Sequence, residues 1–521
     1  MLNYFKNRSF YETLIVIAVT LAFGIGVGFL GALAPKFQVA LGIGMFGFLV
    51  IAFVPHKRSF CLFLWVLIQP LSIEKILYTA PGLWDNFRGL EVIMNAGDLI
   101  LILLAGIVIF EGTKSRRAIW VWDKKSSLFL AMVLWAIVSY LIHLLFYQSE
   151  FINTSQLGIL HLVRVLLFVI IITSAIKTRS DLIWVLIAVL LILVLQSFLV
   201  CLSFVTTKVY NFGSLLGGPS FSQTYSGGTN TITRAVGTLG VANQQGLFHA
   251  MFTFLLIGFF AVKKPFFRYA ALSVIVGSFI AVIFTFSRGS WLTMGLATVL
   301  IFCVFFKRRE ITPRSWLVGG LIMLLFSAAL AAVAQPIIDR LTKGDDGATD
   351  SRIRMITLAK DLFLQYPIIG VGPSEYVEAG LKLYPPGYKT NEWTPLGDKA
   401  IVPPLGRIEL ARIDVPGYPT LIIPLPVHNK YMLILSELGV VGLLLWLMIF
   451  YEFYRDAKSC SKSKDPLLRF IGIAGLGIVL VAVVYMNLDL FADDKTLQIL
   501  LFPLLVITAA NRVAIKQARD Y

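Results

Sequence analysis

The residues best suited to chemistry lie at the start of a strongly apolar segment near the C-terminus. His428 and Asn429 come first, and after nine further residues Gly439 and Gly442 follow, three positions apart. A neutral imidazole can take a proton from a hydroxyl group at physiological pH, which makes His428 a candidate general base and Asn429 a secondary site residue. A structural hydrogen bond is the alternative role for this histidine.

Arginines at the edges of other apolar segments form a second group of candidates. Arg288, in the stretch SRGSW, separates two apolar runs with almost no loop, and Arg234 directly precedes a third run. A guanidinium held by the backbone presents paired donors that suit a phosphate. For Arg288 the alternative is an interfacial side chain that reaches lipid phosphates.

His161 and Arg164 are three residues apart and share one face of a predicted helix. They form either a pair that packs helices together or, for Arg164, a further positive charge in a cavity. Charged groups at the centre of a membrane helix cost about 2.5 to 3.5 kcal/mol each, so those present usually line a cavity.

Composition indicates which elements must position these residues. Of the 521 residues, 58% are hydrophobic and 14% are charged. Runs long enough to cross a hydrocarbon core of roughly 30 Å must be helices, because a spanning backbone has to satisfy its own hydrogen bonds. The sequence therefore predicts an all-α polytopic membrane protein of about 12 to 14 transmembrane helices. The predicted spans are approximately 12–33, 37–54, 59–78, 92–111, 126–147, 157–176, 181–206, 242–262, 267–286, 288–306, 315–334, 428–452, 467–487 and 495–512.

The net charge of +16 is distributed along the chain in step with these spans, so it indicates topology and not a nucleic-acid partner. The basic residues of the short loops all fall on one side: Lys57, Arg58, Lys114, Arg116, Arg117, Lys124, Lys125, Lys177, Arg179, Lys263, Lys264, Arg268, Lys307, Arg308, Arg309, Arg314, Lys458, Lys462 and Lys464. By the positive-inside rule this side and both termini are cytoplasmic. The first span is expected to be a retained anchor, with cleavage as the alternative.

Three longer connections are predicted to face outward, at 72–91, 207–241 and 335–427. The chain then divides into an N-terminal transmembrane bundle (1–206), a central region with the arginine motifs (207–334), a large extracytoplasmic loop domain (335–427) and C-terminal transmembrane helices (428–521). Within the large loop, Ser351–Tyr366 is helix-like, and we expect it to lie on the outer leaflet. Its expected apolar face comprises Ile353, Ile356, Leu358 and Leu362, and it carries the secondary candidates Arg352 and Arg354.

Signals for metal or nucleotide binding are weak. The chain has no GxxxxGK[ST] phosphate loop and no HExxH motif. Two acidic groups, Asp345 with Asp346 and Asp350, and Asp489 with Asp493 and Asp494, do not complete a ligand pattern for a hard cation. We therefore predict no metal and no cofactor, and we interpret these aspartates as solvated loop charge.

Four motifs occur in the order of a known family. HN, nine residues, G, two residues and G at His428–Gly442 resembles the signature of the O-antigen ligase and O-antigen polymerase superfamily. SRGSW at 287–291, RAVGTLGVANQQG at 234–246 and SRIRMITLAKDLFLQYPIIGVGPSEY at 351–376 look like its other blocks. The resemblance covers about 230–450.

The resemblance implies a membrane glycosyltransferase with a fold of the C type (GT-C-like), in the bacterial inner membrane with its site on the outer face. The implied donor is a glycan on undecaprenyl pyrophosphate, and the acceptor is a lipid-linked glycan, a lipid A core or a protein hydroxyl. Arg234 and Arg288 would hold the pyrophosphate, His428 would orient or deprotonate the acceptor hydroxyl, and the anomeric centre would invert.

Two other classes of protein remain as alternatives. A flippase or transporter of lipid-linked saccharides would handle the same pyrophosphate, but its site is expected near the membrane midplane and not at one leaflet. A membrane sensor or scaffold would leave the arginines unexplained.

Overall fold

The computed structural model of the protein describes residues 56–79, 91–116, 118–146, 152–208, 224–227, 230–308, 348–383, 410–413, 421–424, 427–488 and 494–520. Helices dominate these residues. The long ones are α5 (Ala96–Ser115), α6 (Lys124–Phe146), α7 (Ile152–Ala175), α8 (Arg179–Thr206), α11 (Pro265–Phe284), α12 (Arg288–Lys307), α17 (Lys430–Cys460), α18 (Pro466–Tyr485) and α19 (Asp494–Asp520).

Shorter elements complete the fold. The short helices are α4 (Lys57–Ile68), η1 (Gln69–Leu71), α10 (Ala242–Phe252), which continues as the 3-10 helix η2 (Thr253–Ala261), α15 (Ala348–Gln365) and α16 (Tyr376–Leu383). The strands form three antiparallel hairpins: β1 (Glu74–Thr79) with β2 (Glu91–Asn95), β3 (Thr224–Gly227) with β4 (Asn230–Thr233), and β5 (Leu410–Ile413) with β6 (Leu421–Pro424).

Ten helical segments of the described residues are long and apolar enough to span a membrane, with α10 and η2 counted as one segment. They coincide with ten of the predicted spans, and the predicted class, an all-α polytopic membrane protein, is confirmed. The predicted spans 12–33, 37–54 and 315–334 lie outside the described residues.

The predicted span 59–78 is wrong as a single helix. Helix α4 ends at Ile68, Pro70 lies in the short turn η1, and β1 begins at Glu74. Proline has no backbone N–H and its ring clashes with the carbonyl four residues earlier, so a helix does not continue through this position. Ser72 then takes a left-handed conformation with φ of 57°, which turns the chain into the hairpin.

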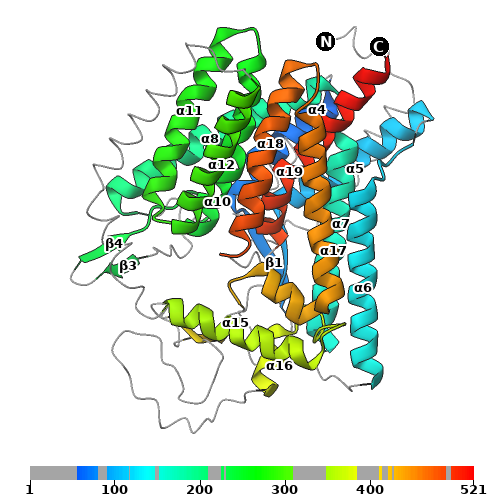
Figure 1. The fold of residues 1–521 in the computed structure, drawn as a ribbon, viewed down its shortest axis with the longest axis vertical. Helices are drawn as coiled ribbons and strands as arrows, with labels where there is room; N and C mark the ends of the chain where they lie inside the picture. Colours follow the sequence, from blue (N-terminus) through cyan, green and yellow to red (C-terminus); the bar gives the residue numbers. More distant parts are fainter. Residues whose placement is uncertain are drawn as a thin grey trace, which may run out of the picture.

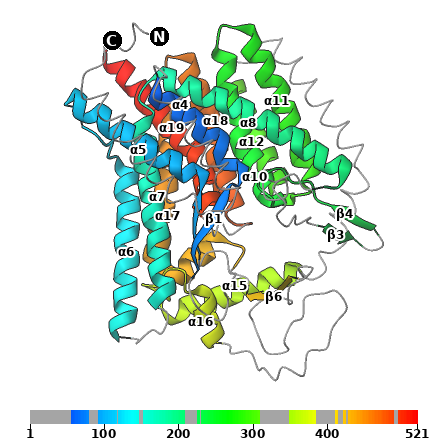
Figure 2. The same cartoon turned by 180° about the vertical axis from the view of Figure 1, so that it is seen from behind.

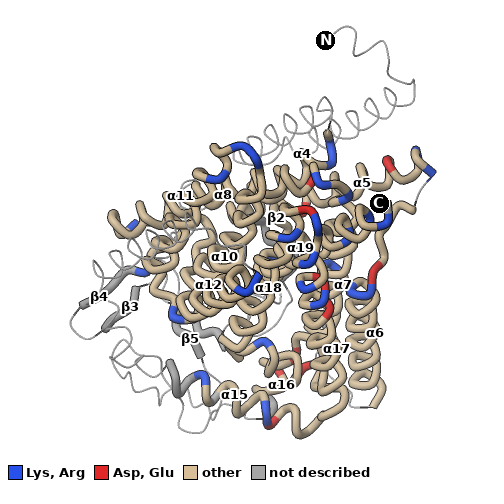
Figure 3. Tube along the Cα trace, turned by 45° about the horizontal axis from the view of Figure 1, so that its top comes forward, with Lys and Arg blue, Asp and Glu red and all other residues tan. Residues whose placement is uncertain are grey.

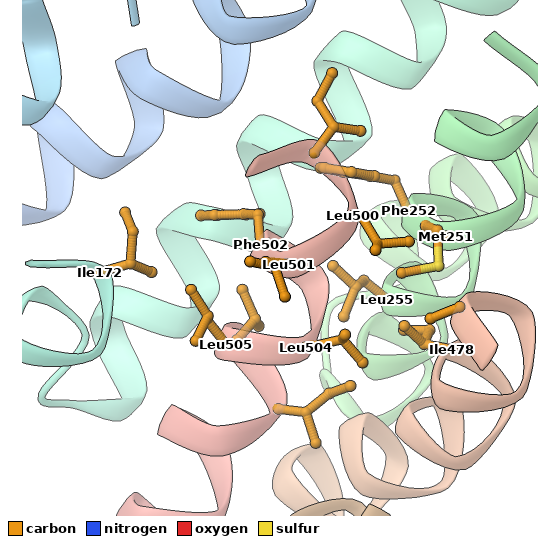
Figure 4. Close-up of a cluster of buried hydrophobic side chains, with 14 of the residues drawn as sticks. Ile172, Met251, Phe252, Leu255, Ile478, Leu500, Leu501, Phe502, Leu504 and Leu505 are labelled. Carbon is orange, nitrogen blue, oxygen red and sulfur yellow. The ribbon is translucent and has the colours of Figure 1, made fainter. Parts of the chain in front are cut away.

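The helices run alternately up and down the bundle, and two groups flank a central layer. Helices α8, α10, α11 and α12 form one side, α5, α6, α7 and α17 form the other, and α18 and α19 lie between them, as both views show (Figures 1 and 2). Helix α19 is the centre of the core: its leucines and Phe502 pack against Ile172, Phe252 and Ile478 from three other helices (Figure 4).

The basic segments gather at one end of the bundle. Lys and Arg mark the start of α4, the end of α5 and the C-terminal end of α19 (Figure 3). Ion pairs join helix ends in this region: Arg58 of α4 bonds to Asp181 of α8 at 3.0 Å, and Lys125 of α6 bonds to Asp456 of α17 at 2.6 Å. The side of a membrane that this end faces remains a prediction.

Helix α15 has two apolar faces instead of the single predicted one. Leu358 and Leu362 are buried against α16 and the start of α17, whereas Ile353 and Ile356 are exposed. The four residues do not share one face because 356 and 358 lie about 200° apart around a helix of 3.6 residues per turn. The packed face attaches α15 across the end of the bundle opposite the basic segments (Figures 1 and 2).

Candidate functional site

Arg234 lies in the segment that enters α10 and is held from two directions. Its Nε donates to the carbonyl of Thr285 at 3.1 Å, and its Nη2 donates to Oδ1 of Asn243 at 2.6 Å. The backbone N–H of Ala235 also donates to the carbonyl of Phe284 at 3.1 Å. The guanidinium is therefore fixed between the end of α11 and the first turn of α10.

Arg288 is the first residue of α12, directly after the tight turn that ends α11. Phe286 has a φ of 50°, so the chain reverses within about three residues and Arg288 is carried by rigid backbone. The small residues around it permit close packing. A Cβ at Gly246 of α10 would lie 2.8 Å from Cβ of Ser290, and a Cβ at Gly289 would lie 3.0 Å from Leu488.

His428 and Asn429 precede α17, whose first turn is tied to the end of α18. The side chain of Asn429 accepts a hydrogen bond from the N–H of Met432 at 3.0 Å, so it is the N-cap of α17. The N–H of Lys430 donates to the carbonyl of Met486 at 2.8 Å, and the hydroxyl of Tyr431 donates to the carbonyl of Val483 at 2.9 Å. His428 itself is half-buried.

Tyr485, the last residue of α18, links the three motifs. Its hydroxyl donates to the backbone carbonyl of Asn243 at 2.8 Å and lies 3.4 Å from Oγ of Ser290 and 3.5 Å from Oγ of Ser287. The structure therefore brings the backbones that carry Arg234, Arg288 and His428 to one junction at the end of α18. Sequence reasoning missed Tyr485, because a tyrosine at the end of a span is typical of an interfacial anchor.

Three helices, α10, α12 and α17, begin at this junction. The first turn of a helix presents unsatisfied backbone N–H groups and the positive end of the helix dipole, which favour an anion. Among the described residues, neither Val241 before α10 nor Ser287 before α12 caps its helix with a side-chain hydrogen bond. With two arginines, the junction has the composition of an anion-binding site.

The glycines of the HN motif position the first half of α17. Gly439 interrupts the helix with φ of 67° and ψ of −169°, a conformation that is essentially limited to glycine. Residues 367–372 hydrogen-bond along the break: the N–H groups of Val371 and Gly372 donate to helix carbonyls at 2.8 and 2.9 Å, and the N–H of Val440 donates to the carbonyl of Pro367 at 2.9 Å. Residues 430–438 therefore form a separate half-helix, which begins directly after His428 and Asn429.

Close approach of the two backbones requires glycine on both sides. A Cβ at Gly439 would lie closer than 3.0 Å to the carbonyl of Ile368, and one at Gly370, where φ is 71°, would meet the backbone of Glu437 equally closely. The carbonyl of Leu438, freed by the break, accepts a hydrogen bond from Nε1 of Trp135 at 2.9 Å. The motif block 351–376 and the HN motif are thus one packed unit.

Arg164 has a defined structural partner. Its Nη2 donates to Oδ2 of Asp98 at 3.0 Å and to the carbonyl of Ile93 at 2.9 Å, which ties α7 to the start of α5. His161 lies one turn earlier on α7 and is half-buried. These hydrogen bonds of Arg164 lead to β2 and α5, and any contact of Arg164 with substrate remains a prediction.

Arg352 and Arg354 both lie in α15, which packs against α16 and α17 through Met355, Leu358 and Leu362. Arg352 is half-buried. The helix places both residues on the end of the molecule that carries His428.

A buried polar group supports the Arg234 segment from behind. Gln196 on α8 donates to Oγ1 of Thr238 at 2.5 Å and accepts from its N–H at 3.1 Å, and Thr238 donates to the carbonyl of Pro70 at 2.6 Å. Two further polar residues, Gln245 and His249 of α10, are fully buried. The segment that carries Arg234 is therefore held against α8 as well as α11.

In the described part of the chain, no group of three or more His, Cys, Asp or Glu side chains is arranged to hold a metal ion. Asp345, Asp346, Asp489 and Asp493 lie outside the described residues.

The fold is that of a polytopic membrane protein, and the junction lies at the ends of its helices opposite the basic segments (Figures 1 and 3). Residues 271–447 match the family model described as O-Antigen ligase, so the resemblance to the O-antigen ligase-related superfamily is confirmed over this segment. The matched segment includes Arg288, α15 and His428, whereas Arg234 and Tyr485 lie outside it. No curated protein matches the chain. The family match supports glycan transfer of the ligase or polymerase type.

Proposed function

We propose that the protein transfers or polymerises a glycan from an undecaprenyl-pyrophosphate-linked donor onto an acceptor hydroxyl at the outer face of the bacterial cytoplasmic membrane. The observation that carries this proposal is the junction at the end of α18. There the hydroxyl of Tyr485 contacts the segments that contain Arg234 and Arg288. The carbonyl of Met486, the next residue, accepts a hydrogen bond from the N–H of Lys430 at the start of α17, directly after His428 and Asn429.

In the proposed reaction, Arg234 and Arg288 bind the donor pyrophosphate. The bond between the anomeric carbon and the phosphate oxygen breaks, and its electron pair leaves with the lipid pyrophosphate. Negative charge grows on that oxygen in the transition state, where fixed cations and backbone N–H groups stabilise it more than in the ground state. The rigid turn that carries Arg288 keeps this stabilisation in place before the reaction starts.

His428 accepts the proton of the acceptor hydroxyl as that oxygen attacks the anomeric carbon from the opposite face, so the configuration inverts. Asn429 sets the start of α17 and thereby the position of His428. Arg352 and Arg354 contribute acceptor or headgroup contacts from α15, and Arg164 supports the bundle through Asp98. The proposed reaction needs no nucleotide and no metal.

The distribution of charge supports an outward-facing site. Arg288 begins α12, whereas Arg234 and His428 lie in the segments that enter α10 and α17. These helices begin at the end of the bundle opposite the basic segments (Figures 1 and 3), and the positive-inside rule assigns the basic end to the cytoplasm. A transporter site is expected near the midplane between repeats, so a site at helix ends favours transfer over transport.

The test is reconstitution in vesicles with a pyrophosphate-linked oligosaccharide and three acceptors: lipid A core, a second lipid-linked repeat and a protein. Arg288→Ala is expected to lower the rate by about 100-fold or more, the usual effect of removing one transition-state donor. Arg268→Ala is the matched control, since Arg268 bonds to the carbonyl of Val262 at the basic end and should leave the rate unchanged.

Full activity of the folded Arg288→Ala variant would refute the assigned role of this residue. Movement of unchanged donor across the bilayer, without glycosylated product on any acceptor, would refute transfer and support the flippase alternative.

A further inference from the structure

Tyr485 lies at the end of α18, where the segments that contain Arg234, Arg288 and His428 meet. It is buried, and it lies beyond the residues 271–447 that match the O-antigen ligase family. Its only polar atom in the side chain, the phenol oxygen, has hydrogen-bonding neighbours on two helices other than its own.

We propose that Tyr485 is a positioning residue that holds Arg234, Arg288 and His428 in the mutual arrangement needed for transfer. The inference rests on the proposed function. It assigns to a buried side chain a role that acts through the residues it contacts.

The first contact acts on Arg234. The Tyr485 hydroxyl donates to the backbone carbonyl of Asn243 at 2.8 Å, and the side chain of Asn243 accepts from the guanidinium of Arg234 at 2.6 Å. One residue of the first turn of α10 therefore connects the phenol to the arginine. Loss of the hydroxyl leaves the half-buried Asn243 carbonyl without this donor and loosens the turn that orients Arg234.

The second contact acts on the turn of Arg288. Ser290 Oγ bonds to Ser287 Oγ at 2.9 Å, and both lie within 3.5 Å of the phenol oxygen. The ring of Tyr485 also packs on Gly289, where a Cβ would lie 3.4 Å from it. The serines on both sides of Arg288 thus form one hydrogen-bonded group with Tyr485.

The third contact acts on the His428 segment through the backbone. Met486, next to Tyr485, accepts the N–H of Lys430 at 2.8 Å, two residues after His428. The end of α18 therefore contacts all three segments. The phenol oxygen of Tyr485 makes the contacts with α10 and α12, and the carbonyl of Met486 makes the contact with α17.

Tyr485→Phe removes the hydroxyl and keeps the packed ring. We expect a fall in kcat of about 10- to 100-fold, because misplacement of reacting groups by about 1 Å can cost 100-fold in rate. The donor KM is expected to stay within about threefold, since both arginines still attract the pyrophosphate.

Thr173→Val is the matched control. Thr173 is also buried, and its hydroxyl donates to a backbone carbonyl, that of Val169, at 2.7 Å near the end of α7. Valine keeps the shape of the side chain and removes the hydroxyl. The control loses a comparable hydrogen bond in a helix outside the junction, and its kcat should stay within about twofold of wild type.

A second substitution tests whether Tyr485 acts through the serine group. If it does, Ser290→Ala combined with Tyr485→Phe should lower kcat little more than Tyr485→Phe alone, because both changes break the same contact. Multiplied effects in the double variant would contradict action through Ser290.

Amide hydrogen exchange of 234–246 provides a readout that does not depend on activity. Faster exchange is expected in Tyr485→Phe and not in Thr173→Val. Unchanged exchange together with a kcat within twofold of wild type would overturn the inference. Failure of the wild-type protein to transfer any glycan would instead remove the proposed function, and the exchange result would still decide whether Tyr485 positions the Arg234 segment.

Discussion

Replacing Gly439 by alanine tests whether the stability of the protein depends on the break in α17. Gly439 has φ of 67° and ψ of −169°, which L-residues almost never adopt, so alanine has to strain the backbone or change its conformation. Residues held in such regions cost about 1 to 3 kcal/mol each. This first contribution concerns the backbone of Gly439 alone.

A second contribution arises from contact with the neighbouring chain. The new Cβ would lie closer than 3.0 Å to the carbonyl of Ile368, and that backbone cannot withdraw freely, because Val440 and Gly372 hydrogen-bond across the same contact. Added volume in a packed interior typically costs about 1 to 3 kcal/mol. The two contributions together predict a loss of roughly 2 to 6 kcal/mol in the free energy of unfolding.

Thermal unfolding of the purified protein in lipid nanodiscs measures the effect, with Gly295→Ala as the matched control. Gly295 lies in the middle of α12, and a Cβ there would meet no atom within 4 Å. Alanine is favoured over glycine in a helix by about 1 kcal/mol, so the control should melt at the wild-type temperature or above it.

A Gly439→Ala variant that melts at the wild-type temperature would contradict this prediction. It would mean that α17 can run straight through this position and that residues 367–372 do not depend on the break. A destabilised variant should also transfer glycan more slowly, since the half-helix 430–438 carries His428.

Two further predictions concern buried polar groups. His249→Leu is expected to raise the melting temperature, by the equivalent of about 1 to 3 kcal/mol, because neither ring nitrogen has a hydrogen-bonding partner among the residues that the structure describes. A lower melting temperature would show that the ring is hydrogen-bonded in the membrane. Arg164→Met should destabilise the protein by about 2 to 3 kcal/mol, because the partly buried Asp98 loses its ion pair, and Asp98→Asn in the same background should restore part of the loss in a thermal unfolding assay. No recovery would place the importance of Arg164 elsewhere, such as in substrate contact.

The helices could be predicted from the sequence because the membrane sets their length and composition. Among the described residues, each predicted span from 92–111 to 495–512 is a continuous apolar run that coincides with a spanning helix, although α17 is interrupted at Gly439. The predicted span 59–78 does not form a spanning helix. There hydropathy and local backbone chemistry disagree: the run is apolar enough, but Pro70 ends the helix at Ile68.

The site was predictable at the level of motifs and not at the level of contacts. Arg234, Arg288 and His428 could be identified because charged or polar groups at the mouth of a span are costly and stand out. Tyr485 could not, because its role depends on three segments that are distant in sequence. The positive φ of Gly439 could likewise not be predicted, because it depends on the close approach of Ile368, which is distant in sequence.

The backbone hydrogen bonds between residues 367–372 and α17 limit which segments of this protein can be exchanged independently. A segment that exchanges backbone hydrogen bonds with a membrane helix is inherited with that helix, so α15 and the 367–376 turn cannot be replaced independently of the HN motif. Chimeras that swap the large loop between related chains should therefore keep 351–376 with the recipient's own α17 and place their junctions after α16. Such chimeras keep the half-helix 430–438 hydrogen-bonded to residues 367–372 of the same chain.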